Sequence, residues 1–307
     1  MLREQRAPTC AVDAEGTPPN QVDADAGHGS ARQPRKTITR IRPSHGWRAL
    51  DLAELWRYRE LAVLLAWRDV QVRYKQTALG VAWALIQPLL AMGIFALFFG
   101  NLIQVPSDGV PYALFAFVGL LPWTYFANAT TNASSSLVAN TNLISKVYFP
   151  RLVIPLAGVG SALVDLAIGF LVLLVLLIAF GVVPTINLLF IPLLIVLAVL
   201  TALGVSIWLS ALDVQYRDVR YAIPFLIQVW LFATPVVYPA SVIPEQYRAF
   251  YGLNPMSGVV EGFRWALLGR TPPPGPLLLV SAVMVLLILV TGLFYFRRME
   301  RTFADVI

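Results

Sequence analysis

Six long apolar stretches, separated by short polar connections, constrain this 307-residue chain more than any other feature of its sequence. A helix needs about 20 mostly apolar residues to cross the hydrocarbon core of a bilayer. Because the core holds no water, each stretch must satisfy its backbone hydrogen bonds internally, which favours helices. The sequence therefore predicts an all-α integral membrane protein with six transmembrane helices, at residues 79–100, 111–127, 152–183, 188–212, 221–238 and 277–296.

The composition agrees with this class of protein. The chain is 58% hydrophobic and only 13% charged, whereas a soluble domain has about 25% charged residues. Its single cysteine, Cys10, excludes a disulfide within the chain. The net charge of +6 could suggest nucleic acid as a partner, but the distribution of that charge favours a membrane.

Positive charge gathers on one side of the predicted spans. If the spans alternate in direction, 20 of the 23 Lys and Arg residues fall on the side of both termini, and the other side holds Arg248, Arg264 and Arg270. Basic residues concentrate in cytoplasmic loops. We therefore expect a multi-pass protein of the cytoplasmic (inner) membrane, with both termini in the cytoplasm and residues 239–276 outside.

The region before the first span divides into two parts. Residues 1–45 have no apolar periodicity and are typical of a disordered cytoplasmic tail, which leaves residues 46–307 as the transmembrane domain. Residues 51–76 interleave apolar and basic side chains, a pattern that suits an amphipathic helix lying among lipids at the cytoplasmic interface. A helix packed on a partner is the alternative. The marker residues are Trp56, Arg57, Trp67 and Arg68.

Motifs for catalysis or nucleotide binding are absent from the sequence. The two histidines, His28 and His45, form no Cys/His cluster for zinc, and no lysine follows a glycine as in a phosphate-binding loop. Asp165 is the one acidic residue well inside an apolar stretch. It is either a functional group, here a candidate for a substrate channel, or a carboxylate paired with Arg151 or a backbone group.

Several segments, in order along the chain, carry a family resemblance: residues 68–90, 119–129, 142–151, 212–239, 254–269 and 296–307. Together they resemble the permease subunits of ATP-binding-cassette type-2 transporters that export polysaccharides such as O-antigen, capsule or teichoic acid. The resemblance covers about residues 51–307. It implies a two-fold dimer of this chain, two separate ATPase subunits that bind ATP and Mg, and a lipid-linked polysaccharide as substrate.

Residues 142–151 follow a polar linker and place apolar side chains on a short cytoplasmic helix. In the resembled family this region is the coupling helix, which seats in a cleft of the ATPase subunit. We expect its apolar side chains, Phe149 above all, to be buried by another subunit; an ordinary connection folded back on the membrane is the alternative. The candidate coupling residues are Asn142, Leu143, Ile144, Lys146, Val147, Phe149, Pro150 and Arg151.

Two further groups of candidates lie near the ends of spans. The first group lies between the fourth and fifth spans and consists of Asp213, Tyr216, Arg217 and Asp218. These residues can form a gate, cytoplasmic ion pairs of Arg217, or an anchor for the end of a helix. Aromatic side chains suit either the interfacial belt of a membrane protein or, as the resemblance implies, the lining of a polysaccharide channel. These aromatic residues are Trp123, Tyr125, Phe126, Trp230, Phe232 and Tyr238.

The long outer loop, residues 239–276, holds a mixed segment at 258–269 that ends at Gly269. Its length suits a short re-entrant or interfacial helix better than a span, and the resembled family has such helices over the outer mouth of the pore. Glu261 and Arg264 are three residues apart, so they can pair on one helix face.

The sequence therefore predicts a transport subunit without its own ATP site, in an ATP-driven exporter of lipid-linked polysaccharide. One alternative is a type-2 permease for drugs or small lipids. Another is a membrane-embedded polyprenyl-phosphate transferase, which would need clustered Asp, Glu or His at the cytoplasmic edge. The short loops there supply little beyond Asp213 and Asp218.

Overall fold

The computed structural model describes residues 52–75, 81–182, 185–270, 273–300 and 303. Within these ranges every regular element is a helix, and five helices are long and apolar enough to cross a membrane. The all-α fold is therefore confirmed for these residues, and the five helices agree with the expected membrane class. The expected tail, residues 1–45, lies outside the described residues.

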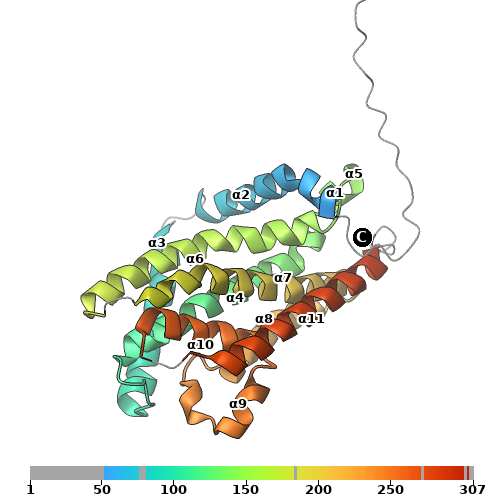
Figure 1. Ribbon diagram of the computed structural model, residues 1–307. Coiled ribbons are helices and arrows are strands. Elements are labelled where there is room, and N and C mark those ends of the chain that lie inside the picture. The colour runs from blue at the N-terminus through green and yellow to red at the C-terminus, as the bar shows by residue number, and fades with distance from the viewer. Residues whose placement is uncertain (1–51, 76–80, 183–184, 271–272, 301–302, 304–307) are drawn as a thin grey trace, which may run out of the picture. The chain divides into compact units, whose positions relative to one another are not determined.

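The helices follow one another with short connections (Figure 1). The helices of spanning length are α3 (Val81–Phe95) continued by the π-helix η1 (Ala96–Leu102), α4 (Tyr112–Ala139), α6 (Val153–Ala179), α7 (Ile191–Gln215) preceded by the 3-10 turn η2 (Ile186–Phe190), and α11 (Gly275–Glu300). The shorter elements are α1 (Leu52–Arg57), α2 (Arg59–Lys75), α5 (Thr141–Lys146), α8 (Val219–Ala233), η3 (Ala240–Val242), α9 (Glu245–Tyr251) and α10 (Pro255–Leu268).

The fifth predicted span, residues 221–238, forms a shorter helix than expected. α8 ends at Ala233 because Thr234 precedes Pro235 and takes an extended conformation, as residues before proline prefer. Its 15 residues rise about 22 Å, less than the roughly 30 Å of hydrocarbon in a bilayer. By helix length, the described chain thus has five spans and one shorter apolar helix.

The second span, predicted at residues 111–127, is longer than expected. The polar residues that follow continue α4 to Ala139 instead of forming a linker. Four of their five hydroxyl groups donate to carbonyls about one turn earlier, as Thr131 does to Ala127 at 2.8 Å, so these four are satisfied inside the helix. The fifth, the buried hydroxyl of Thr130, has no hydrogen-bond partner in the structure. Small side chains also allow close packing between membrane helices, and half of the residues in this part of α4 are buried.

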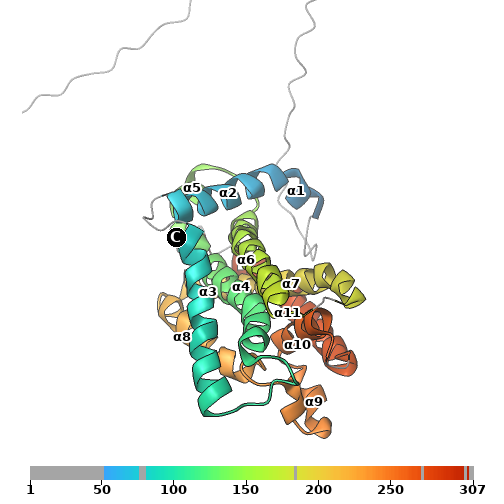
Figure 2. The ribbon, with the colours of Figure 1, turned by 90° about the vertical axis from the view of Figure 1, so that its left-hand side faces the viewer.

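α4 is the central helix of the bundle. It packs against α6, α7, α10 and α3, and most of its side chains are buried. α3 and η1 differ, because no side chain in their span is fully buried. Figure 2 shows α3 along the outside of the bundle.

Contacts between distant segments define the two ends of the bundle. At one end, α2, the segment after α5 and the last part of α11 share an apolar cluster that includes Leu65, Phe149 and Phe296. At the opposite end, the guanidinium of Arg270 donates to the carbonyl of Gly109 at 2.6 Å. The segments that an alternating topology assigns to the same side of the membrane therefore gather together.

Candidate functional site

The predicted coupling segment forms α5 and an extended stretch after it. Phe149 is only 6% exposed, since it packs in one cluster with Leu65 of α2 and Ile154 of α6. The expectation that another subunit must bury Phe149 is therefore wrong, because its own chain supplies the partners. The neighbouring Val147 and Tyr148 are 52% and 71% exposed, so these two residues offer the free apolar surface of the segment.

The rest of the coupling segment is anchored to its own chain. Leu143 and Ile144 pack partly buried against the same cluster. The carbonyl of Pro150 accepts from the amide of Val153 at 3.0 Å, at the start of α6. The guanidinium of Arg151 donates to the carbonyl of Glu300 in α11 at 2.8 Å. Asn142 and Lys146 are exposed.

Asp165 does not pair with Arg151, the side chain that one of the two alternatives named as its partner. Its carboxylate instead accepts hydrogen bonds from Arg73 and Tyr74 at the end of α2, and Arg73 and Asp165 form an ion pair. The structure thus joins α2 to the interior of α6 through a charged contact that the sequence pattern did not indicate.

The expected interface helix is divided into α1 and α2, with a break at Tyr58. α2 carries apolar residues on two sides: Leu65 and Val70 are buried, while Leu64 and Trp67 are exposed. One side packs on α6. The other side is exposed, and Trp56 in α1 is exposed as well. Arg57 is also exposed, and Arg68 pairs with Asp69 at 2.9 Å.

The segment between α7 and α8 contains a different ion pair from the one expected. Asp213 is 2% exposed and pairs with Arg220 at 3.1 Å, not with Arg217. Because α8 begins at Val219, Arg220 lies in its first turn, where it reaches back to the end of α7. Tyr216, Arg217 and Asp218 are exposed.

The predicted pair within residues 239–276 is confirmed. In α10, Arg264 donates to Glu261 at 2.7 Å. The helix starts where the Asn254 side chain accepts from the amide of Met256 at 3.1 Å. It ends at Gly269, whose φ of 64° is the left-handed conformation that glycine adopts most readily.

Arg264 is completely buried and holds the non-helical segment that directly follows α8. Its guanidinium donates to the carbonyls of Pro235 and Val236, each at 2.6 Å, and lies 3.7 Å from the ring centroid of Phe115 in α4. A side chain at Gly119 would meet it, since an added Cβ would lie 2.8 Å from Arg264 Nη2. Buried irregular backbone needs such internal donors.

The candidate channel aromatics separate into two groups. Trp123, Tyr125 and Phe126 are buried in the core of the chain, and Phe126 packs edge-on against Trp230 with ring centroids 5.2 Å apart. In this conformation these three side chains stabilise the bundle and face neither lipid nor a channel. Phe232 is 56% exposed, and Trp230 and Tyr238 are partly buried.

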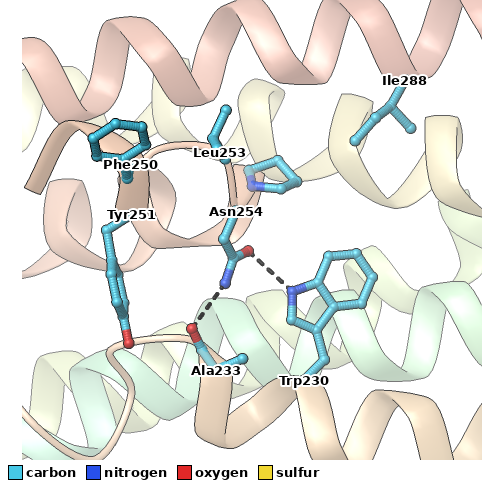
Figure 3. A pocket seen from close by; sticks show the side chains of 8 residues that line it. Trp230, Ala233, Phe250, Tyr251, Leu253, Asn254 and Ile288 are labelled. Carbon is cyan, nitrogen blue, oxygen red and sulfur yellow. Dashed lines mark hydrogen bonds between the residues drawn. The ribbon is translucent and has the colours of Figure 1, made fainter. Parts of the chain in front are cut away.

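A cavity of about 480 Å³ lies between α8, the α9–α10 connection and α11 (Figure 3). The amide oxygen of Asn254 accepts from Trp230 Nε1 at 3.0 Å. Its amide nitrogen donates to the carbonyl of Ala233 and to Thr234 Oγ1. This amide therefore ties the end of α8 to the start of α10. The lining residues are Trp230, Ala233, Phe250, Tyr251, Leu253, Asn254, Pro255 and Ile288.

Comparison with known proteins adds to this geometry. A family model described as ABC-2 type transporter matches residues 60–268. The O-antigen export system permease protein RfbA of Myxococcus xanthus is 31% identical over 251 residues, which cover 80% of this chain and 96% of that protein. RfbA of Klebsiella pneumoniae is 30% identical over 251 residues, which cover 81% of this chain and 95% of that protein. The polysialic acid transport protein KpsM of Escherichia coli is 23% identical over 234 residues, which cover 76% of this chain and 91% of that protein.

Proposed function

The chain belongs to the ABC-2 type transporter family, and from this premise we propose that it is the channel-forming membrane subunit of an ATP-driven polysaccharide exporter. One observation carries the proposal. The chain aligns with nearly the full length of relatives whose names specify O-antigen export and polysialic acid transport. Both cargoes are polysaccharides, which favours a glycan over a drug or a small lipid. A lipid-linked polysaccharide would cross the cytoplasmic membrane.

The energy would come from two separate ATPase subunits, because the sequence contains no phosphate-binding loop. The exposed Val147 and Tyr148 are the apolar surface that such a subunit would cover. Phe149, buried beside them, would hold this surface on α2 and α6. A displacement of the ATPase would then reach the bundle as a rigid-body movement.

A second copy of the chain would complete the pore. α8 places Tyr221, Phe225, Gln228 and Phe232 at spacings of one helix face, and all four are exposed. A glutamine facing hydrocarbon would leave its amide unpaired, at a cost in free energy. Aromatic and amide groups together suit contact with sugars, so this face fits a glycan path between two copies.

The test restores the chain to a strain that lacks its own permease gene and measures polysaccharide at the cell surface. We expect export with the ATPase subunit present and none without it. In the same strain, Tyr148→Asp should insert into the membrane but lose the ATPase on purification, because it places a charge in an apolar contact. Tyr247→Asp is the matched control, since Tyr247 is an exposed tyrosine in α9.

Retention of the ATPase by Tyr148→Asp would remove this segment as the coupling element. Phe149→Asp serves a different purpose. Because Phe149 is buried among side chains of its own chain, we expect this variant to reduce the amount of folded protein as well as binding of the ATPase.

The proposed orientation places the end that carries α2 and α5 in the cytoplasm. Single cysteines at Ser145 and Gln246, both exposed, report it in a variant without Cys10. An impermeant thiol reagent added to intact cells should label position 246 quickly and position 145 slowly. Fast labelling at position 145 alone would show that the chain has the opposite orientation in the membrane.

A further inference from the structure

Asp165 lies in the interior of a span. It is about 18 Å along α6 from Val153, at a rise of about 1.5 Å per residue, and its side chain is 17% exposed. A carboxylate this far inside an apolar helix is costly unless it is paired. Its partners therefore indicate why the chain keeps it there.

Both partners come from the last residues of α2. Arg73 donates to Oδ2 of Asp165 and Tyr74 donates to Oδ1, so each carboxylate oxygen has one donor. Hydrogen bonds to an ionised group are stronger than neutral ones. Burial, followed by the hydrogen bond to Asp165, raises the pKa of Tyr74 to about 12, so the hydroxyl keeps the proton that it donates.

The same helix also contacts the coupling segment. Arg68, in the middle of α2, donates to Asn140 Oδ1 at 2.9 Å, and Asn140 precedes the first residue of α5. Leu65 shares the apolar cluster of Phe149. α2 thus binds the coupling segment through its middle and α6 through its end.

We propose that Asp165 is a positioning residue for transport, which holds α2 on α6 so that movement of the coupling segment reaches the spans. This inference rests on the proposed function. Asp165 acts here through Arg73 and Tyr74 and does not contact the polysaccharide, in contrast to its candidacy as a channel residue. The ion pair is the only charged link between α2 and α6 among the described residues.

The experiment compares three variants in the full chain, co-expressed with the ATPase subunit: Asp165→Asn, Arg73→Gln and the exchange Arg73→Asp with Asp165→Arg. The control, Glu60→Gln, removes one negative charge from an exposed position of α2 itself. Three quantities are measured for each: the amount of assembled complex, its ATP hydrolysis, and export of polysaccharide by cells.

We expect Asp165→Asn and Arg73→Gln to assemble and hydrolyse ATP but to export about tenfold less per ATP, the scale of coupling between contacting residues. The exchange variant should recover most of the export, which a loss of substrate contact would not allow. If Asp165→Asn does not accumulate in the membrane, export by Arg73→Gln tests the proposal instead, because this variant leaves the sequence of α6 unchanged.

Normal export by Arg73→Gln, or an exchange variant as defective as Asp165→Asn, would overturn the inference while the proposed function stands. Failure of the unsubstituted chain to restore polysaccharide export would instead overturn the proposed function. Glu60→Gln should export like the unsubstituted chain.

Discussion

α4 and α8 are both apolar helices of one bundle, yet α4 is buried inside its own chain and α8 is mostly exposed on it. In α4 the buried side chains lie on all sides of the helix. In α8 only Ile223 and Ile227 are buried. The sequence pattern alone treats the two as similar spans, because hydropathy measures preference for an apolar environment and does not say whether protein or lipid provides it.

The difference separates two kinds of apolar residue. A side chain of α4 contributes to folding of the single chain, since its neighbours are already present. An exposed side chain of α8 contributes little to folding and remains available to a second copy, to lipid or to a glycan. Matched substitutions on the two helices therefore distinguish stability from assembly and transport.

The largest effect is expected at the contact that joins α4 to the segment after α8. Arg264→Met leaves the buried Glu261 without its ion-pair partner and several carbonyls without their donor, which should lower the free energy of unfolding by about 3–5 kcal/mol. Denaturation of the purified chain in detergent measures this change in the free energy of unfolding. Arg270→Met is the control, because Arg270 is exposed and donates to the carbonyl of Gly109. Equal stability of both variants would contradict the role of Arg264.

The same change on the two helices gives the direct comparison. Phe126→Ala in α4 removes a completely buried ring and should cost about 3 kcal/mol of stability. Phe225→Ala in α8 removes a ring that is 66% exposed and should change stability by less than about 0.5 kcal/mol. Phe225→Ala should instead reduce export. A stable variant with normal export would show that this face meets only lipid.

A smaller loss of stability than that of Phe126→Ala is expected where α8 meets the end of α7. Arg220→Gln removes the partner of the buried Asp213, and because Arg220 is about half exposed the loss should be about 1 kcal/mol. Arg217→Gln, at an exposed position in the same segment, should have a smaller effect. Thermal unfolding of both variants, side by side, measures the difference. A larger loss for Arg217→Gln would contradict the observed pairing.

The sequence by itself determined what depends on local spacing and on apolar length. The all-helical fold, the approximate positions of five of the six predicted spans, the short helix ending at Gly269 and the pair of Glu261 with Arg264 follow from residues close together in the chain. Family membership was also accessible, because its motifs are contiguous segments whose order alone is informative.

Only the tertiary structure decided which surfaces these helices share. α4 continues through its polar half because α6 and α7 bury it, Phe149 is covered by α2 and α6, and Asp165 pairs with Arg73 from a separate helix. Each of these contacts joins residues far apart in the chain. Local patterns cannot specify such partners, since burial and pairing depend on the path of the whole chain.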